Sequence, residues 1–305
     1  MELLDPPVGI APPPAAQARI LPANLLFLIS LILVLNLGGA AQMWQMWPGL
    51  ILTEIFCILL PAWLFARKTT SPATALRLKW VGAAPCWMGL VIGASLFPLA
   101  AATGWVAEKI LGYRLLLSDS SWPEGFGGAL VCVLALAVSA PFCEEMLFRG
   151  YILAAYERSG WRPRGAILAV AALFTAYHLS PARSLGVALF ALAFTYIAWR
   201  TGSVWPSIAA HMGANGMAAL VVITRNRWAT EYPSPCEVIF VGIPAAAAAA
   251  FCIWCIAGRP RSPTPEIVPC STRAGQWWPL FVAGVIAVAA AGAEFAINRF
   301  PDLSP

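Results

Sequence analysis

The sequence predicts an all-α membrane protein, a polytopic transmembrane helix bundle of about 8–9 spans. The composition is 60% hydrophobic and only 11% charged, and the mean hydropathy is +0.75. A soluble domain of 305 residues must cover its core with polar side chains, and this chain has too few of them. Apolar runs of helix length recur along the whole chain, so most of it is expected to lie in a bilayer.

The apolar runs define the expected spans, most of them near the length that crosses about 30 Å of hydrocarbon at about 1.5 Å per residue. The first run is not preceded by a basic segment and is followed by further spans, which favours an uncleaved helix over a signal peptide. The runs at 165–179 and 184–199 are short. The nine candidates cover roughly 24–42, 48–66, 80–104, 127–146, 165–179, 184–199, 204–223, 237–257 and 277–297.

Four segments are expected along the chain. Residues 1–21 are rich in Pro and Ala and predict a disordered N-terminal tail. Residues 22–124 form the N-terminal transmembrane helices, 125–225 hold the candidate site, and 226–305 form the C-terminal transmembrane helices.

The distribution of basic residues predicts how the chain is inserted. The net charge is +5, but Lys and Arg fall in short clusters between apolar runs rather than along one face, so nucleic acid is not an expected partner. Placing the N-terminus in the cytoplasm puts 12 basic residues on the inner side and 6 on the outer side. The positive-inside rule therefore predicts an integral, multi-pass protein with a cytoplasmic N-terminus and, after nine spans, an external C-terminus.

Glu144, Glu145 and Arg149 lie in one of the most apolar parts of the chain. Ionised groups cost several kcal/mol in hydrocarbon, so carboxylates within a span indicate a functional site. Adjacent residues on a helix point about 100° apart, so the two carboxylates cannot do the same job. Arg149 lies about one turn further on and can pair with one of them, which leaves the other as a base. The alternative is a buried Glu–Arg staple without catalysis.

The two histidines of the chain, His178 and His211, also lie in apolar helix-length runs. His211 and Asn215 are four residues apart, so they share one face of a helix. An Asn in this position could donate a hydrogen bond to an oxyanion or orient the imidazole. A single histidine in a membrane helix often makes only an interhelical hydrogen bond, but two of them with an intramembrane Glu pair indicate a shared site.

Three linked motifs carry a resemblance to a known family. In order they are Glu144-Glu145-x-x-x-Arg149, Phe174-x-x-x-His178 and His211-x-x-x-Asn215. Together they resemble the CAAX protease and bacteriocin-processing (CPBP) family of intramembrane proteases, which is related to the Ras-converting prenyl protease. The resemblance covers roughly residues 125–225.

The resemblance implies peptide-bond hydrolysis in a cavity within the membrane. Glu144 would be the general base that activates a water, His178 would position that water, and His211 with Asn215 would stabilise the oxyanion. Glu145 and Arg149 would support the site. The implied substrate is a lipidated or membrane-anchored peptide or protein, cleaved near its C-terminus or a membrane-proximal segment. The implied location is a bacterial inner (plasma) membrane.

A metal is the alternative to a metal-free site. Glu144, His178 and His211 could in principle bind zinc, but the chain has no His-Glu-x-x-His motif and Asn215 suits an oxyanion better. The sequence therefore favours water activated by a glutamate, without a cofactor.

Two features of the sequence oppose or complicate this interpretation. Counted from the inner end of each predicted span, Glu144 lies at roughly 3 Å, His211 near ~10 Å and His178 near ~20 Å of depth, although the three need to meet around one water. A Glu144 helix that continued past Arg149 would place its carboxylate deeper, and helix tilt would add to this. Two more carboxylates, Glu54 and Glu294, fall within other spans. The competing functions are a proton-coupled transporter that uses Glu54, Glu144, Glu145 and Glu294 as a relay, and a non-catalytic immunity or scaffold protein of the same fold.

Overall fold

The computed structural model describes residues 20–113, 122–224, 234–260 and 274–299. These residues form helices and connecting turns, with no strand among them. Eight helices are long and apolar enough to cross a membrane, and Pro163–Tyr177 is a shorter apolar helix. The predicted all-α bundle is confirmed. The predicted tail at residues 1–21 falls almost wholly outside the described residues.

The long spans are each built from one or more consecutive helical segments. Leu21–Trp44 contains α1 (Leu21–Leu33), η1 (Val34–Gly38) and α2 (Gly39–Trp44), and Met46–Ala66 contains α3 (Met46–Thr53), η2 (Glu54–Leu59) and α4 (Leu60–Ala66). Gly125–Arg158 contains α7 (Gly125–Val133), η4 (Leu134–Ser139), α8 (Ala140–Glu145), η5 (Met146–Ile152) and α9 (Leu153–Arg158). The others are α6 (Ala83–Leu111), α10 (Pro163–Tyr177), α11 (Pro181–Thr201), α12 (Trp205–Ile223), η7 with α14 (Val238–Gly242, Ile243–Ala257) and α15 (Trp278–Arg299). Short helices α5 (Pro72–Ala75), α13 (Pro235–Glu237) and η8 (Ala274–Gln276) lie between them.

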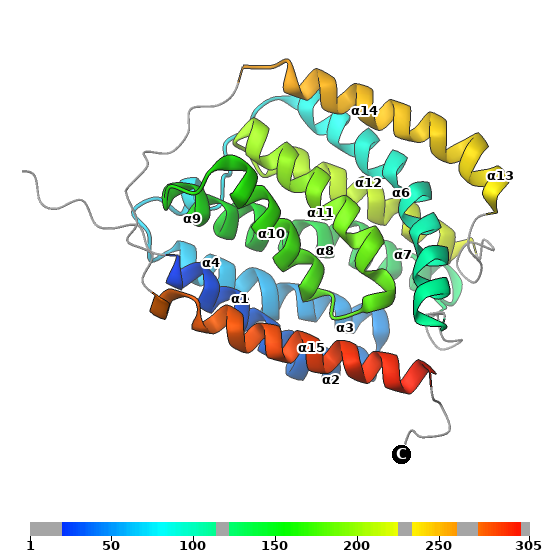
Figure 1. The fold of residues 1–305 in the computed structure, drawn as a ribbon, viewed down its shortest axis with the longest axis horizontal. Helices are drawn as coiled ribbons and strands as arrows, with labels where there is room; N and C mark the ends of the chain where they lie inside the picture. The colour runs from blue at the N-terminus through cyan, green and yellow to red at the C-terminus, as the bar shows by residue number, and fades with distance from the viewer. Residues whose placement is uncertain (1–19, 114–121, 225–233, 261–273, 300–305) are drawn as a thin grey trace, which may run out of the picture.

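The long helices run roughly side by side, and successive helices run in opposite directions (Figure 1). Helix α10 lies among the long helices and runs back between the end of α9 and the start of α11, although it is shorter than they are. Helix α1 starts at the end of the bundle near α9, and α15 finishes at the opposite end (Figure 1). The first and last described helices therefore begin and finish at opposite ends of the bundle.

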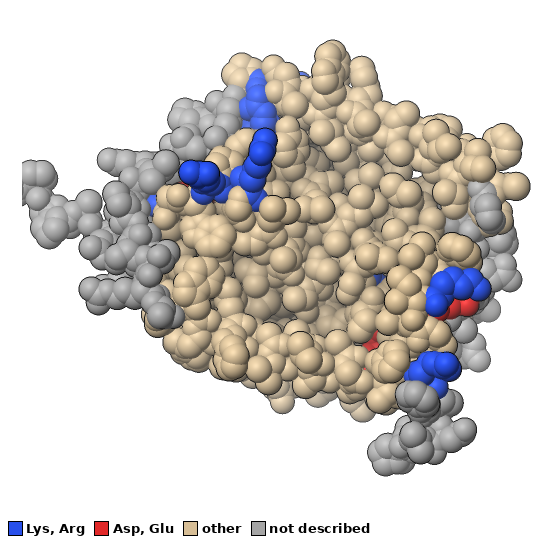
Figure 2. All heavy atoms as spheres, viewed as in Figure 1, with Lys and Arg blue, Asp and Glu red and all other residues tan. Residues whose placement is uncertain are grey.

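The surface of the bundle is apolar between its two ends. Large hydrophobic side chains are exposed along several spans, including Leu37, Phe251, Phe281 and Val288, each more than half exposed. Figure 2 shows Lys and Arg side chains toward the two ends of the view and an almost uncharged surface between them. Such a surface is stable only against hydrocarbon. The chain is thus suited to an integral, multi-pass position in a membrane.

Helices α6 and α12 pack so closely that their backbones touch. A Cβ atom added at Gly93 would overlap the carbonyl of Ala210, and one at Gly213 would overlap the carbonyl of Leu90. A Cβ atom at Gly89 would likewise overlap the carbonyl of Pro206. Small residues allow the two backbones to approach closely. In lipid there is no hydrophobic driving force between helices, so this van der Waals contact is what stabilises the pair. This contact fixes α12, which carries His211 and Asn215.

Three π-helical segments end two residues before a proline. They are η2 before Pro61, η4 before Pro141 and η7 before Pro244. In η4 the N–H of Ala140 donates to Ala135 rather than to Leu136, five residues back instead of four. Pro141 has no N–H to continue the ladder, so the widened turn leaves the Leu136 carbonyl without a backbone donor.

Glu294 is anchored by neighbouring helices. The Tyr113 hydroxyl donates to Glu294 Oε1 at 2.6 Å, and the Ala182 N–H lies 3.4 Å from the same oxygen. The carboxylate joins the end of α6 and the start of α11 to α15. Glu294 therefore has a structural explanation, which the sequence left open.

Candidate active site

The helix that carries the glutamate pair is longer than predicted. The sequence predicted a span that ends at 146, whereas the structure continues the helix through η5 and α9 to Arg158. The predicted end was wrong because the apolar run is interrupted by a charged residue, Arg149, that the structure buries. Arg149 has no exposed surface. The continuation moves Glu144 deeper into the bundle, as the catalytic interpretation required.

Arg149 is held by three helices at once. Its Nη1 lies 2.7 Å from Glu145 Oε1, its Nε donates to Thr195 Oγ1 at 3.1 Å, and its Nη2 donates to the Ala191 carbonyl at 3.3 Å. The guanidinium carbon lies 4.1 Å from the ring centroid of Phe174, a cation–π contact. This set neutralises the charge and satisfies donors from all three guanidinium nitrogens, which makes full burial affordable.

Glu145 connects Arg149 to His211. The oxygen that accepts from Arg149 also lies 3.0 Å from His211 Nδ1. A carboxylate paired with arginine can only accept, so His211 Nδ1 must carry the hydrogen. Glu145 therefore sets the orientation and tautomer of the imidazole and directs Nε2 away from itself. The predicted partner of this imidazole, Asn215, does not contact it by a hydrogen bond.

Glu144 faces the other nitrogen of the same ring. Its Oε2 lies 4.0 Å from His211 Nε2, and this oxygen is buried without a hydrogen-bond partner among the described residues. A distance of 4.0 Å is too long for a hydrogen bond, but a water about 2.8 Å from each atom would contact both. Of the two adjacent glutamates, Glu145 pairs with Arg149 and His211 through Oε1, whereas Glu144 makes no hydrogen bond to another described residue.

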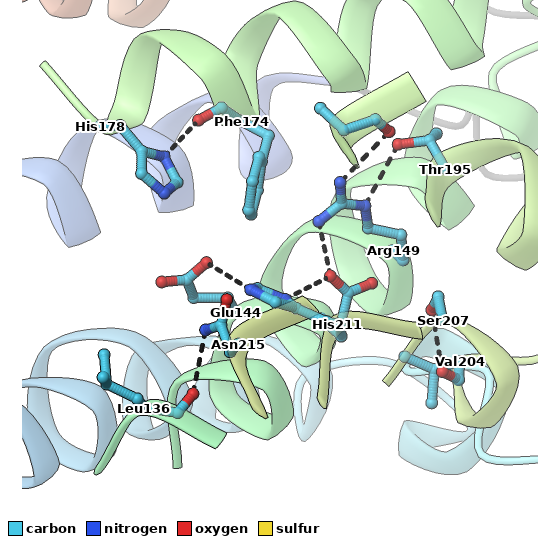
Figure 3. Close-up of polar contacts among 12 residues, drawn as sticks. Leu136, Glu144, Arg149, Phe174, His178, Thr195, Val204, Ser207, His211 and Asn215 are labelled. Atoms are coloured by element: carbon cyan, nitrogen blue, oxygen red, sulfur yellow. Dashed lines mark hydrogen bonds and ion pairs between the residues drawn. The ribbon is translucent and has the colours of Figure 1, made fainter. Parts of the chain in front are cut away.

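His178 caps the end of α10 and lies near the same region (Figure 3). Its Nδ1 lies 3.0 Å from the Phe174 carbonyl, which can only accept, so Nδ1 carries the hydrogen and Nε2 of the neutral ring offers a lone pair. The Phe174 ring has its centroid 4.8 Å from that of His178 and 5.8 Å from that of His211. Phe174 thus separates the two imidazoles and also contacts Arg149.

Asn215 is oriented by the widened turn before the glutamate pair. Its Nδ2 donates to the Leu136 carbonyl at 2.9 Å, the carbonyl that Pro141 leaves without a backbone donor. One N–H of the amide is used in this bond, and the second N–H remains available to a ligand. The side chain of Asn215 lies beside Glu144 and His211 (Figure 3).

The difference in depth that the predicted spans implied has two structural solutions. Glu144 is 14 residues from the end of its helix at Arg158, or about 21 Å at about 1.5 Å per residue, which agrees with His178 at the far end of α10. The turn before α12 is itself buried, with Ser203 and Val204 at 0% exposure, so α12 starts well inside the bundle. His211 therefore reaches the level of Glu144 although few residues precede it on its helix.

A zinc ion at this site would need Glu144, His178 and His211 as its ligands. Nε2 of His178, Nε2 of His211 and Glu144 Oε2 are chemically suitable ligands in the tautomers described. However, within the described ranges no three His, Cys, Asp or Glu side chains are grouped closely enough to hold a metal ion. The described side chains around Glu144 therefore do not fit the zinc alternative.

A family model matches the segment that contains all six predicted site residues, which are Glu144, Glu145, Arg149, His178, His211 and Asn215. The type II CAAX prenyl endopeptidase Rce1-like family model aligns with residues 126–217. The chain carries a domain of the Rce1-like CAAX prenyl endopeptidase family. No curated protein and no solved structure matches the chain. The matched segment starts in α7 and ends in α12, and therefore includes both histidine-bearing helices.

The match over residues 126–217 implies a peptidase, and for its substrates it implies prenylated or membrane proteins. This favours hydrolysis over the transporter and scaffold alternatives. The match does not assign roles to individual residues of the endopeptidase domain.

Sequence reasoning missed several contacts of this CAAX endopeptidase domain. Thr195 and Ala191 of α11 hold Arg149, and the Phe194 ring lies 5.4 Å from that of His211, centroid to centroid. Thr195, Ala191 and Phe194 are residue types that commonly pack between membrane helices, so the sequence gives no signal for their contacts with the site. The contact of the Leu136 carbonyl with Asn215 was also missed. Pro141, just before the glutamate pair, was a usable signal that the helix is interrupted there.

Proposed function

We propose that this protein is an intramembrane endopeptidase that hydrolyses a peptide bond near the C-terminus, or in a membrane-proximal segment, of a lipidated or membrane-anchored substrate. The observation that carries the proposal is the pairing of Glu144 with His211. A buried carboxylate oxygen without a partner lies 4.0 Å from an imidazole nitrogen whose ring is fixed by a second glutamate. Such a carboxylate can accept a proton from a water, and the fixed imidazole beside it can face the carbonyl oxygen that the water's attack charges.

In the proposed reaction, Glu144 is the general base. The water donates one hydrogen to Glu144 and the other to Nε2 of His178, which leaves an oxygen lone pair directed at the scissile carbonyl carbon. As the C–O bond forms, a water proton moves to Glu144 and the carbonyl oxygen becomes an oxyanion. Glu144 then returns the proton to the departing amine nitrogen as the C–N bond breaks, which gives a carboxyl and an amine product.

The oxyanion would be stabilised by Asn215 and His211. The free N–H of Asn215 supplies one donor. His211 supplies a second donor through Nε2 when both ring nitrogens carry hydrogen, because Nδ1–H is already directed to Glu145. The carboxylate of Glu145 compensates the positive charge of that form, because Glu144 carries the water proton at this stage. Each donor of this kind contributes about 10²–10³-fold in kcat.

For the insertion of the protein in the membrane, we infer a cytoplasmic N-terminus. The support is the excess of basic residues at the end of the bundle where α1 begins and α9 ends, including Arg67, Lys68, Arg158, Arg162 and Arg164. A bacterial inner membrane remains the expected location. Cysteine accessibility at either terminus, read from each side of the membrane, tests this orientation.

Cleavage of membrane-anchored substrates by purified protein tests the function. Candidates are a peptide with a prenylated C-terminal cysteine and an unlipidated membrane-anchored version of it, incubated with wild type, Glu144→Gln, His178→Ala and His211→Ala. We expect cleavage by wild type and a loss of about 10³-fold or more in Glu144→Gln, because the amide cannot accept the water proton. Equal cleavage by wild type and folded Glu144→Gln would contradict the proposed base.

A further inference from the structure

A third carboxyl lies against the proposed base. Glu54, at the start of η2, is 3% exposed, and its Oε2 is buried without a hydrogen-bond partner among the described residues. Segment η2 packs against α8, the helix of the glutamate pair. The carboxyl groups of Glu54 and Glu144 are close enough for their charges to interact. Glu54 therefore belongs to the same buried polar region as Glu144, although it comes from the second span.

Among the residues that the structure describes, none pairs Glu54 with a positive charge. Cys143 and Glu144 of α8, Tyr177 of α10 and Cys57 of its own segment are within electrostatic range. The ion pairs of the described residues include none with Glu54. An isolated carboxylate in hydrocarbon costs several kcal/mol, and a second carboxylate beside it adds repulsion.

The hydroxyls near Glu54 are already committed elsewhere. Ser30 Oγ donates to the Cys57 carbonyl at 2.8 Å, so the Tyr177 hydroxyl, 2.6 Å from Ser30 Oγ, must donate to Ser30. Neither hydroxyl hydrogen is left for Glu54. The other unpartnered carboxylate oxygens of this region are Glu144 Oε2 and Glu145 Oε2, of which Glu144 faces the proposed water site.

We propose that Glu54 is a neutral carboxylic acid that positions Glu144, through one water held between the two carboxyls. No direct hydrogen bond joins Glu54 and Glu144, whereas one water can accept from the Glu54 O–H and donate to Glu144 Oε2, which satisfies both buried atoms. The shared water restricts the rotamer of Glu144 and leaves its charge intact. Glu54 is a positioning residue and acts only through Glu144. This inference rests on the proposed function for its kinetic consequence, and for the protonation of Glu54 on its burial, its unpartnered Oε2 and the packing of η2 against α8.

Infrared spectroscopy of the protein in lipid tests protonation without requiring activity. A protonated carboxyl has a C=O stretch above the amide band. We expect that band at neutral pH in wild type and in Glu144→Gln, and its loss in Glu54→Gln. Glu294→Gln is the matched control, because its carboxylate accepts from Tyr113 and its removal should leave the band unchanged. A spectrum in which Glu54→Gln retains the full band overturns the proposal, even if no substrate is cleaved by any variant.

Kinetics of two substitutions test the positioning role. Glu54→Gln keeps a neutral donor of the same size, and we expect kcat within about threefold of wild type. Glu54→Leu removes the donor, and we expect kcat to fall by about 10–100-fold, the usual effect of an outer-shell partner, with KM unchanged. The Leu variant should unfold at the same or a higher temperature, because an unpaired buried carboxyl is lost. Wild-type kcat in Glu54→Leu, or equal losses in both variants, would overturn the assignment.

Discussion

Glu145 Oε1 lies 3.0 Å from His211 Nδ1 and receives Arg149 on the same atom at 2.7 Å. One oxygen thus links a fully buried cation to the imidazole that faces Glu144. The two adjacent glutamates have different partners because successive residues of a helix point about 100° apart. The position of α12 beside α8 then decides which carboxylate orients the histidine and which one remains available.

Replacing Glu145 by Gln should reduce both activity and stability. The amide can donate to Nδ1, which favours the other tautomer of His211, and Arg149 loses its counter-charge. We expect kcat to fall by roughly 100-fold or more and the free energy of unfolding by about 3–5 kcal/mol. Steady-state cleavage and thermal unfolding in detergent measure the two effects.

Glu157→Gln provides the comparison for this substitution. Glu157 pairs with Arg77 in a second buried ion pair near the end of the bundle, with 8% and 6% exposure. This variant should lose stability but keep kcat. If the two variants lose activity in proportion to their stability, the orienting role of Glu145 is wrong.

Pro141 and Asn215 should affect the same step to different extents. Asn215→Ala removes an oxyanion donor, and we expect a loss of about 10²–10³-fold in kcat. Pro141→Ala restores a backbone N–H that competes for the Leu136 carbonyl, which now accepts from Asn215. The expected loss is smaller, about tenfold, because Asn215 keeps its amide. Single-turnover cleavage measures both; a larger effect for Pro141→Ala than for Asn215→Ala would contradict this order.

Gly93→Ala should destabilise the bundle at the contact of α6 with α12. The added methyl group meets the backbone of Ala210, which cannot rotate away, so the helices must separate. We expect a loss of about 1–3 kcal/mol, measured by thermal unfolding in detergent. Gly284→Ala in α15 is the control, because a Cβ there has open space and the change should be neutral or stabilising.

Chelators should leave cleavage unchanged. No step of the proposed mechanism uses a metal, and the side chains around Glu144 do not group as a metal site in the part of the chain that the structure describes. Activity with and without a strong zinc chelator, followed by zinc addition, measures this. Loss of activity with chelator and its recovery with zinc would make Glu144, His178 and His211 the ligands to test first.

The sequence was sufficient to predict the spans, but not the contacts that the candidate site residues make between helices. Apolar runs of helix length are a local property, and they gave spans that agree with those of the structure within several residues, except at the end of the Glu144 helix. That end was missed because the cost of burying Arg149 depends on Thr195, Ala191 and Phe174, which come from other helices.

The division of roles within the site is equally non-local. Glu145 rather than Asn215 orients His211 because of the close packing of α12, and Asn215 turns to Leu136 because Pro141 widens a turn on another helix. Residue spacing along one helix predicts shared faces but not contacts between helices. The sequence marks Glu54 as an unusual carboxylate within a span. That Glu54 lies near Glu144 follows only from the packing of η2 on α8.

The complete burial of Arg149 has a consequence for the biosynthesis of the protein. The segment Gly125–Arg158 is synthesised before α10 and α11, which supply the ring of Phe174 and the oxygens of Thr195 and Ala191. Until they arrive, the guanidinium has only Glu145 as a partner, and an arginine at mid-membrane opposes insertion by about 2.5–3.5 kcal/mol. The nascent segment is therefore expected to stay near the insertion machinery until α11 follows, so that the catalytic helix enters the bilayer together with its neighbours.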